Sequence, residues 1–361
     1  MPLKIAIVGC GKIADGHIEE IQKMPEVAKV VAVSDLEILM AEQIAMRYRI
    51  PRHYDNFERM LEEQRPDVVH IATPPGSHLA LAKLSIDAGC HIYVEKPLTL
   101  NFEDSKKLVD YAAAHDKKLT LGYTYLFDPP AIAMRELIAS GALGEAVHVE
   151  SFFGYNLSGP FGSAILGDAG HWVHRLPGKL FHNNIDHMLN KLSEFIDDDQ
   201  PQVKAFGYAR REVRHGDSRD DLLDELRVTI FGARTSAYAT FSSHARPAGH
   251  FVRVFGTKDT AHVDYLARTV TLAGSSSLPA AVGRLYPAFN QAWQYLREGG
   301  RNAARFARSD FHFFSGLHHL LALYYASILT NGPPPISYRD ILRVSAMMDE
   351  IFRQVRQGGA A

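Results

Sequence analysis

Two short motifs carry the residues best suited to chemistry in this chain. The first is a glycine turn, Gly9-Cys10-Gly11-Lys12-Ile13-Ala14, and the second is the triplet Glu95-Lys96-Pro97. A glycine turn of this kind lets the backbone approach a pyrophosphate closely. A lysine held at the end of a strand can hydrogen-bond a substrate hydroxyl and stabilise alkoxide character as a hydride leaves the carbon. Together the two motifs predict a nicotinamide-dependent dehydrogenase.

The residues around the glycine turn predict a strand, a turn and a helix in that order. Residues 4–8 form the apolar, β-branched run of a buried parallel strand, and residues 12–23 have the pattern of a helix. The helix N-terminus would aim its free amides and positive dipole end at phosphates. We therefore expect Gly9, Gly11, Lys12 and Ile13 to bind a dinucleotide. A glycine-rich turn without a ligand is the alternative.

The second predicted strand, residues 30–34, ends at Asp35. An acidic side chain at this place accepts hydrogen bonds from the adenosine ribose hydroxyls. Leu36 and Glu37 follow, so no neighbouring cation is present to neutralise a 2′-phosphate. The sequence therefore favours NAD over NADP as the cofactor.

Two further predicted strands end in residues that we assign to the cofactor. Residues 67–72 lead into a proline-stiffened loop, and residues 91–94 lead into Glu95 and Lys96. Open α/β sheets bind ligands at the carboxyl ends of their strands. The expected contacts from these two ends are Ala72, Thr73, Pro74, His78, Glu95 and Lys96. Taken alone, a strand-end lysine is more often simply solvated, and that interpretation of Lys96 stays open.

The pattern changes after about residue 124, where alternating strands replace the strand–helix alternation. Residues 147–155, 225–231, 235–242, 251–255 and 261–265 are separated by turn signals, which indicates an antiparallel sheet. We predict a dinucleotide-binding domain of doubly wound parallel α/β type over residues 1–124. Residues 125–361 are predicted to form a second, α+β domain that binds substrate and supports oligomerisation.

Residues 180–196 predict a helix with one apolar and one polar face. His182 and Asp186 are four residues apart on the polar face, so they would be neighbours. A carboxylate beside an imidazole fixes its tautomer and raises its basicity, which suits a general base. His187 is a further candidate for this role. A polar face without a catalytic role is the structural alternative.

Several residues near these candidates have the chemistry of substrate contacts. Trp172 could stack on a sugar face, while His174 or Arg175 could bind a carboxylate or phosphate. A buried anchoring role for Trp172 is equally consistent with the sequence. The complete set of predicted substrate contacts is Tyr123, Tyr125, Trp172, His174, Arg175 and Asn183.

These motifs resemble the Gfo/Idh/MocA family of oxidoreductases. The resemblance is carried by the glycine turn, the Ala72-Thr73-Pro74-Pro75 loop with His78, the Glu95-Lys96-Pro97 triplet and Gly141-Ala142-Leu143-Gly144-Glu145. It implies an N-terminal Rossmann domain, a C-terminal α+β domain with a large open, mostly antiparallel sheet, and NAD(P)-dependent oxidation or reduction of sugars, cyclitols or nucleotide sugars. The family usually places an aspartate four residues before a histidine in the second-domain helix. Here His182 and Asp186 invert that order.

Two other functions remain open for such a scaffold. One is a redox-neutral, NAD-dependent glycosidase or lyase that uses the same site. The other is a non-catalytic regulator that senses the cofactor.

Composition limits the class of protein. The 361 residues, 46% hydrophobic and 22% charged, are those of an ordinary globular protein. A formal net charge of −2 argues against nucleic acid as the main partner. The two cysteines, the absence of a signal-peptide pattern and the lack of a long apolar run predict a cytoplasmic protein without a membrane span.

Residues 284–308 combine five arginines with several large apolar residues. We expect an ordinary solvated helix whose apolar stripe faces the core; contact with a membrane surface or an anionic partner is the alternative. The histidines at 171, 174, 182 and 187 match no zinc spacing, so no metal is predicted. We also expect a homodimer or homotetramer formed through the C-terminal sheet.

Overall fold

The computed structural model describes residues 1–210, 214–215, 218–219, 222–274, 279, 283–308, 311 and 314–358. These residues form two compact units. Unit 1 contains Met1–Thr124 and Gly316–Ser345, and unit 2 contains Tyr125–Ser315 and Ala346–Ala361. The chain therefore returns to unit 1 after it has built most of unit 2.

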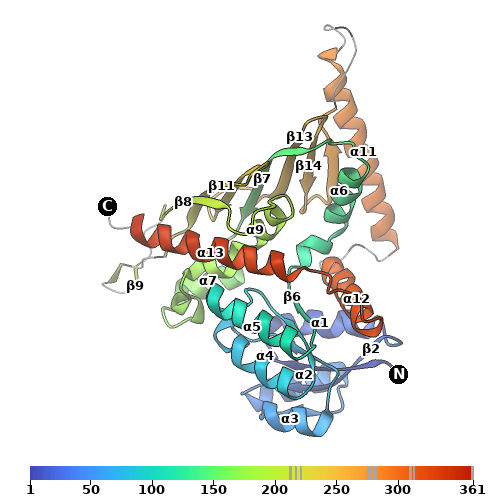
Figure 1. Cartoon of the computed structure of the whole chain (residues 1–361), viewed down its shortest axis with the longest axis vertical. Helices are drawn as coiled ribbons and strands as arrows, with labels where there is room; N and C mark the ends of the chain where they lie inside the picture. Colours follow the sequence, from blue (N-terminus) through green and yellow to red (C-terminus); the bar gives the residue numbers. More distant parts are fainter. Residues whose placement is uncertain are drawn as a thin grey trace. The chain divides into compact units, whose positions relative to one another are not determined.

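Unit 1, whose first 124 residues are drawn from blue to teal in Figure 1, is built on a six-stranded sheet with the order β3-β2-β1-β4-β5-β6. All of its neighbouring strands are parallel. This direction and this strand order are those of a doubly wound dinucleotide-binding fold. Apolar residues on both faces of the central strands are fully buried, as Ile5, Ile7 and Val69 illustrate. The strands are β1 (Leu3–Val8), β2 (Ala28–Ser34), β3 (His53–Tyr54), β4 (Val68–Ile71), β5 (His91–Val94) and β6 (Leu119–Leu121).

Helices connect these strands and cover the sheet. Asparagine side chains begin two of them: Asn56 accepts from the Arg59 amide at 2.8 Å, and Asn101 accepts from the Asp104 amide at 2.8 Å. Each bond satisfies a backbone donor that the first turn leaves unpaired. The helices of unit 1 are α1 (Lys12–Gln22), α2 (Ile38–Tyr48), α3 (Phe57–Gln64), η1 (Pro75–Ser77), α4 (His78–Asp87), α5 (Phe102–Ala114), nearly all of α12 (Ser315–Leu329) and the start of α13 (Tyr338–Gly358).

Unit 2 is built on a seven-stranded sheet with the order β15-β14-β13-β7-β12-β11-β8. Every neighbouring pair in it is antiparallel except β7 with β12. This confirms the predicted fold class. The strands are β7 (Ala146–Gly154), β8 (Gln202–Tyr208), β11 (Glu225–Phe231), β12 (Ser236–Ser242), β13 (His250–Gly256), β14 (Thr260–Asp264) and β15 (Thr269–Leu272); β9 (Arg214–His215) and β10 (Ser218–Arg219) form a separate pair.

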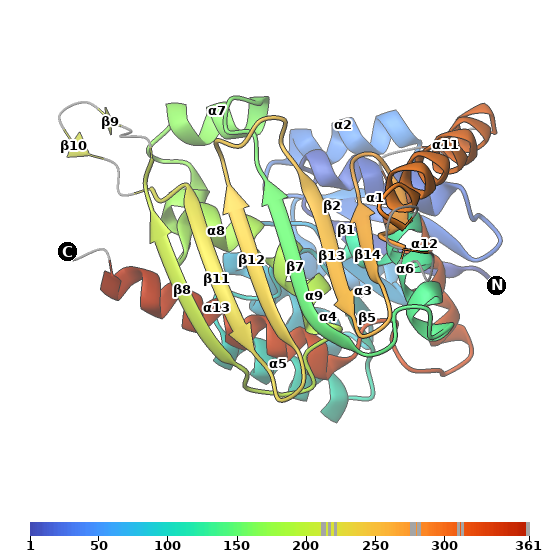
Figure 2. The same cartoon turned by 90° about the horizontal axis from the view of Figure 1, so that it is seen from above.

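The helices of unit 2 leave one face of the large sheet open. Figure 2 views the sheet from that side, with the strands in front. Side chains on this face include Phe206, Phe231 and Tyr238, which are 63%, 48% and 37% exposed. The helices are η2 (Thr124–Phe127), α6 (Pro129–Ala139), α7 (Pro160–Gly167), η3 (Trp172–Arg175), α8 (Lys179–Asn184), α9 (Asp186–Ser193), α11 (Tyr286–Ala307) and the second part of α13.

The predicted orientation of the basic helix is wrong. No residue of α11 is buried, and its large apolar side chains face outward. Gln294 instead faces the sheet edge, where its side chain accepts from the Leu272 amide and donates to the Leu272 carbonyl, at 2.8 and 2.9 Å. A polar stripe suits this place because the edge of β15 offers unpaired backbone groups rather than apolar side chains.

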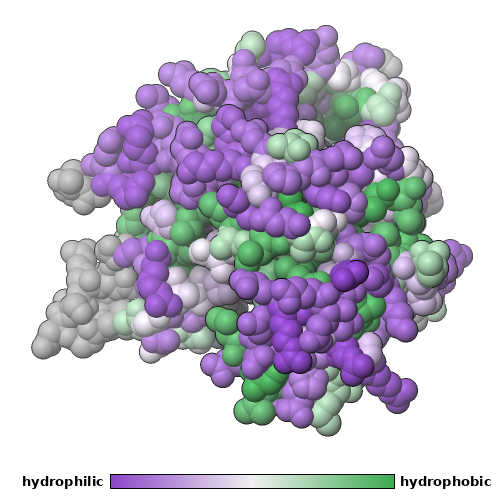
Figure 3. Space-filling view, turned by 60° about the horizontal axis from the view of Figure 1, so that its bottom comes forward, coloured by the Kyte–Doolittle hydropathy of each residue, from purple (hydrophilic) through white to green (hydrophobic). Residues whose placement is uncertain are grey.

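Hydrophilic residues cover most of the molecular face in Figure 3, with hydrophobic residues in patches between them. Among the described residues, no helix combines the length and the apolar composition that crossing a bilayer requires.

Candidate functional site

The predicted cofactor residues of unit 1 meet along one edge of its sheet. Backbone hydrogen bonds join Gly9 to Ser34, Ala72 to Val8 and Glu95 to Ile71, at 2.8 to 2.9 Å. The segments that follow β1, β2, β4 and β5 therefore leave the sheet side by side. This edge, at the carboxyl ends of the strands, is where doubly wound sheets bind ligands.

The glycine turn is shaped by close backbone packing. Gly9 has a φ of +94°, and a Cβ there would lie 2.7 Å from the Ala72 carbonyl carbon, so no side chain fits. Gly11 is the N-cap residue of α1 and has open space where its Cβ would be. Lys12 is exposed and Ile13 is half-buried. The turn thus has the tight bend and the uncovered helix N-terminus that a pyrophosphate requires.

Asp35 is fixed next to this turn. Its Oδ2 accepts a hydrogen bond from the Cys10 amide at 2.7 Å, and its Oδ1 accepts one from the Glu37 amide at 3.0 Å. Burial, together with the Asp35 carboxylate, raises the pKa of the Cys10 thiol to about 12. Cys10 is therefore a packed, unreactive thiol, and Asp35 is oriented by the backbone it contacts.

His78 is fully buried and joins two loops. Its Nε2 lies 2.8 Å from the Thr73 carbonyl oxygen, while its Nδ1 lies 3.0 Å from that of Pro97 and 3.2 Å from that of Leu98. Burial lowers the pKa of His78 against the opposing pull of these carbonyls. The side chain holds the loop that carries Ala72, Thr73 and Pro74 against the segment after Lys96, so its observed role is structural.

Glu95 ends a buried chain of hydrogen bonds. His17 Nε2 lies 3.1 Å from Glu95 Oε1, and His17 Nδ1 lies 2.9 Å from His70 Nδ1. The Tyr325 hydroxyl from α12 lies 2.9 Å from His70 Nε2, and the Tyr93 hydroxyl donates to Glu95 Oε1 at 3.3 Å. None of the four residues that join Glu95 in this network was singled out by sequence reasoning.

One arrangement of protons satisfies this chain throughout. Tyr325 donates to His70, His70 donates to His17, and His17 donates to an ionised Glu95. Burial keeps the pKa of His70 well below its usual value, so this ring stays neutral. Burial opposes ionisation of Glu95, but the His17 hydrogen bond and the nearby Lys96 outweigh it and lower its pKa. The chain therefore holds a carboxylate beside Lys96.

Close packing fixes the place of that carboxylate. A Cβ on Gly122 would lie 2.9 Å from Glu95 Oε1, so a larger residue there would displace the carboxylate from its present place. The Lys96 amide donates to Glu95 Oε2 at 3.3 Å, and the Lys96–Pro97 bond is cis. Lys96 itself is half-exposed at the end of β5. The Lys96 backbone is thus tied to the Glu95 carboxylate, and its side chain is half-exposed.

In unit 2, the helix predicted over residues 180–196 is two short helices that meet at Ile185. Both of its faces are buried, because α9 packs against β7 and β12 while the ring of His182 stacks on Phe352 of α13 at 5.0 Å. His182 and Asp186 are 2% and 0% exposed. Among the predicted polar residues of this segment, only Asn183 and His187 are half-exposed.

Lys191 is a fully buried lysine that the sequence analysis missed. Its Nζ lies 2.9 Å from His250 Nε2 on β13 and 5.4 and 5.1 Å from the ring centres of Tyr125 and Tyr265. Burial lowers the pKa of Lys191 to about 7, although Asp186 and other acids oppose the shift. Burial also places the pKa of His250 well below its usual value. The sequence did offer one signal for this burial, because Lys191 lies between Leu189 and Leu192 in a segment rich in apolar residues.

Tyr125 connects this lysine to His187. The Tyr125 ring contacts His187 edge-on at 4.9 Å and His250 at 4.4 Å. Burial, together with Asp128 and Asp186, raises the pKa of Tyr125 to about 12, so it remains a neutral phenol. Tyr123, also predicted to contact substrate, is 3% exposed. Of the two tyrosines, Tyr125 is the one placed beside an accessible histidine.

We expect replacement of Lys191 by methionine to change how the stability of unit 2 depends on pH. The folded pKa of about 7 lies below the unfolded value of about 10.4, so between them the unfolded chain binds more protons. Stability of the wild type should therefore rise with pH, by about 2 kcal/mol from pH 7 to 9. Lys191→Met should remove that rise.

Urea unfolding followed by tryptophan fluorescence measures this, because Trp172 and Trp293, the two tryptophans of the chain, both lie in unit 2. Lys204→Met, on an exposed position of β8, is the matched control and should keep the rise. Equal pH dependence in the wild type and Lys191→Met would show that the lysine is not titrating in this window.

The segment that carries Trp172, His174 and Arg175, which were predicted to contact substrate, is partly exposed. Trp172 is half-buried and its ring stacks on His171 at 5.6 Å, while Arg175 is exposed. His174 Nε2 lies 2.8 Å from the Ile165 carbonyl oxygen, which joins η3 to α7. Trp172 and Arg175 are thus at least partly exposed, whereas His174 holds the loop.

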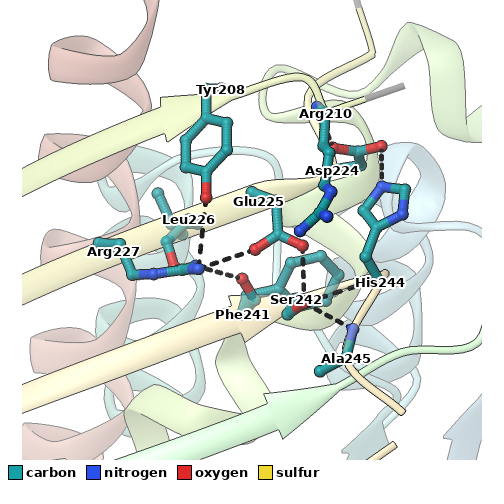
Figure 4. A network of polar contacts seen from close by, with 10 residues as sticks. All are labelled: Tyr208, Arg210, Asp224, Glu225, Leu226, Arg227, Phe241, Ser242, His244 and Ala245. Carbon is teal, nitrogen blue, oxygen red and sulfur yellow. Dashed lines mark hydrogen bonds and ion pairs between the residues drawn. The ribbon is translucent and has the colours of Figure 1, made fainter. Parts of the chain in front are cut away.

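A second polar cluster in unit 2 has its carboxylates fully engaged (Figure 4). Glu225 accepts from Ser242 at 2.6 Å and from Arg227 at 2.9 Å. Asp224 pairs with His244 at 2.7 Å. These bonds fix the loops at the ends of β11 and β12. In the part of the chain that the structure describes, no group of three or more His, Cys, Asp or Glu side chains is arranged to hold a metal ion.

Comparison with known proteins gives a family match for the first third of the chain. Residues 3–123 match the family described as the GFO_IDH_MocA oxidoreductase family, NAD-binding Rossmann fold. The D-glucoside 3-dehydrogenase of Escherichia coli is 30% identical over 144 residues, which are 40% of this chain and 41% of that protein. The trans-1,2-dihydrobenzene-1,2-diol dehydrogenase of Danio rerio is 29% identical over 44% of this chain and 48% of its own. The matches thus span less than half of these relatives.

Solved structures extend the likeness of fold to the whole chain. An oxidoreductase from Agrobacterium radiobacter, in complex with NAD+, L-tartaric acid and magnesium, superposes with a TM-score of 0.77 at 16% identity, over 99% of this chain and 97% of that one. The WlbA dehydrogenase of Bordetella pertussis, in complex with NADH and UDP-GlcNAcA, gives 0.75 at 18% identity over 99% and 98%. At these identities the likeness shows the fold.

Proposed function

Since residues 3–123 of this chain match the NAD-binding Rossmann fold of the Gfo/Idh/MocA oxidoreductases, we propose that the protein is an NAD-dependent dehydrogenase. It moves a hydride between the nicotinamide and a secondary alcohol or ketone of a sugar, cyclitol or nucleotide-linked sugar. The observation that carries the proposal is the meeting of the glycine turn, Asp35 and Lys96 along one edge of the sheet in unit 1.

The residues of that edge fit the cofactor. A Cβ on Gly9 would fill the turn, and Gly11 leaves the start of α1 open to a pyrophosphate. We assign Lys12 and Ile13 to the same contact, Asp35 to the adenosine ribose, and Ala72, Thr73, Pro74 and Glu95 to the walls of the site. When bound, the nicotinamide supplies the hydride acceptor.

Lys96 polarises the reacting hydroxyl in this proposal. Its ammonium donates a hydrogen bond to the substrate oxygen, and that bond strengthens as negative charge develops there. The positive charge of Lys96 in turn helps to lower the pKa of the neighbouring Glu95 carboxyl group. The buried chain from Tyr325 through His70 and His17 serves to keep Glu95 in place.

For the proton we propose His187 rather than His182 with Asp186. His187 is half-exposed and its ring is held by Tyr125 and Phe153, at 4.9 and 5.2 Å. His182 is buried against Phe352, where a hydroxyl has no access. Asn183, Tyr125, Trp172 and Arg175 are the proposed substrate contacts, because each is at least partly exposed.

The cofactor preference tests the proposal. We expect NAD to bind at least tenfold more tightly than NADP, about 1.4 kcal/mol, because Asp35 accepts from ribose hydroxyls and would repel a 2′-phosphate. Titration calorimetry with each dinucleotide measures the gap. Asp35→Ala should narrow it, whereas Asp55→Ala, an exposed acid elsewhere in unit 1, should not. Equal affinities of the wild type for both dinucleotides would contradict the assignment.

We also propose that the protein is a homo-oligomer through the open face of the seven-stranded sheet. Exposed aromatic side chains on that face, Phe206, Phe231 and Tyr238, support this. The molar mass from light scattering decides it, and a monomeric mass at micromolar concentration would refute it.

A further inference from the structure

Helix α11 is amphipathic in the opposite sense to an ordinary surface helix. Its polar side contacts its own chain, since Gln294 binds the Leu272 backbone and Asn302 donates to the carbonyls of Ala267 and Arg268 at 3.0 and 3.1 Å. Its apolar side points away, with Phe289, Trp293 and Leu296 at 73%, 63% and 68% exposed. Such a face is an interaction site.

Two adjacent glycines in the middle of α11 point to the same conclusion. Gly299 and Gly300 lie inside a 22-residue helix, where glycine is less favourable than alanine. A Cβ at either position would meet no atom of the described chain within 4 Å. Nothing in the described part of the chain therefore explains glycine there, but the close approach of another molecule does.

The spacing of the apolar residues indicates what that molecule is. Leu285, Phe289, Ala292, Leu296, Gly299, Ala303 and Phe306 alternate at intervals of three and four, which is the seam of a helix pair. We propose that α11 pairs antiparallel with α11 of a second copy, about a two-fold axis at Leu296. This contact is separate from the oligomer contact proposed for the open face of the seven-stranded sheet. The proposal of helix pairing does not depend on the proposed dehydrogenase activity.

Size complementarity selects this antiparallel register. Residues at equal distances before and after Leu296 lie at the same height in the two helices, so Phe289 faces Ala303 of the partner subunit. Trp293 faces Gly299 of the partner subunit, and the partner's Gly300 lies against Ala292. Large side chains thus meet small ones twice, as the two-fold axis requires, and the glycines make room for the indole.

The charge pattern is compatible with the pair. Arg297 and Arg301 follow Leu296 by about 100° and 140° around the helix, away from the seam. Both form ion pairs with Glu298, whose side chain is 12% exposed. The repulsion between two basic helices is therefore reduced at the contact.

Disulfide trapping tests the pairing directly. The native Cys10 and Cys90 are buried, and burial raises the pKa of the Cys90 thiol to about 11 and that of Cys10 to about 12, so an introduced cysteine reacts alone. Leu296→Cys should form a disulfide-linked dimer under mild oxidation. Arg301→Cys, equally exposed on the other side of α11, should give at least tenfold less.

Mixed samples test the register. A sample of Phe289→Cys with Ala303→Cys should give a heterodimeric cross-link in excess of either homodimer, which parallel pairing would not produce. Equal cross-linking at Leu296 and Arg301 would overturn the proposal. A second result would also overturn it: the wild type binds vesicles of anionic phospholipid, Trp293→Ser does not bind them, and Leu296→Cys forms no cross-link. The apolar face of α11 would then bind a membrane surface.

Discussion

Replacing Lys96 by alanine should lower kcat for oxidation of a polyol substrate by about 10² or more, the usual loss for one positioned electrostatic or acid–base group. The affinity for NAD should change little, because the ammonium acts on the substrate oxygen rather than on the pyrophosphate. Steady-state rates of NAD reduction and calorimetric NAD titration measure the two quantities separately.

The matched control is Lys106→Ala, which removes an exposed lysine of α5 in the same unit. Its kcat should equal that of the wild type. A Lys96→Ala variant that keeps its full kcat would remove this residue from the mechanism. Parallel losses of kcat and NAD affinity would instead indicate that Lys96 holds the cofactor.

Substitution of His187 by asparagine should reduce kcat/KM by about 10², because the variant lacks the group that takes the hydroxyl proton. His182→Asn should leave kcat of the folded protein near the wild-type value and lower the stability of unit 2, since its ring is buried against Phe352. Rates measured beside urea unfolding curves separate the two effects.

The reverse outcome would reassign the base. If His182→Asn abolishes turnover in protein that remains folded, and His187→Asn does not, proton transfer passes through the buried histidine and the burial argument fails. If both variants keep wild-type rates, the histidines of α8 and α9 are structural and the proton is taken by Lys96 or water.

The parallel sheet of unit 1 was predictable because its signals are local. An apolar run before Gly9, a second before Asp35 and a third before Glu95 each report a strand buried on both faces. In a parallel sheet such strand ends necessarily meet at one edge. The alternation in residues 225–265 gave the antiparallel strands for the same reason.

The rest depended on contacts between distant residues. Tyr325 reaches His70 across 255 positions, and Lys191 reaches His250 across 59, so no spacing in the sequence reports either bond. Helical periodicity showed which residues of 180–196 share a face but not that other elements cover both faces. In α11 it found the apolar stripe correctly and could not show that a sheet edge takes the polar side.

The claim at the centre of this account is that the protein transfers a hydride between a cyclic alcohol and NAD. The most direct measurement follows the absorbance of reduced nicotinamide when the purified chain and NAD meet a panel of sugars, cyclitols and nucleotide sugars, with Lys96→Ala in parallel. The account predicts one reduced NAD per molecule of substrate oxidised, and about 10² slower formation in the variant. Substrate turnover without net reduction, or NAD binding with no turnover of any member of the panel, would contradict it.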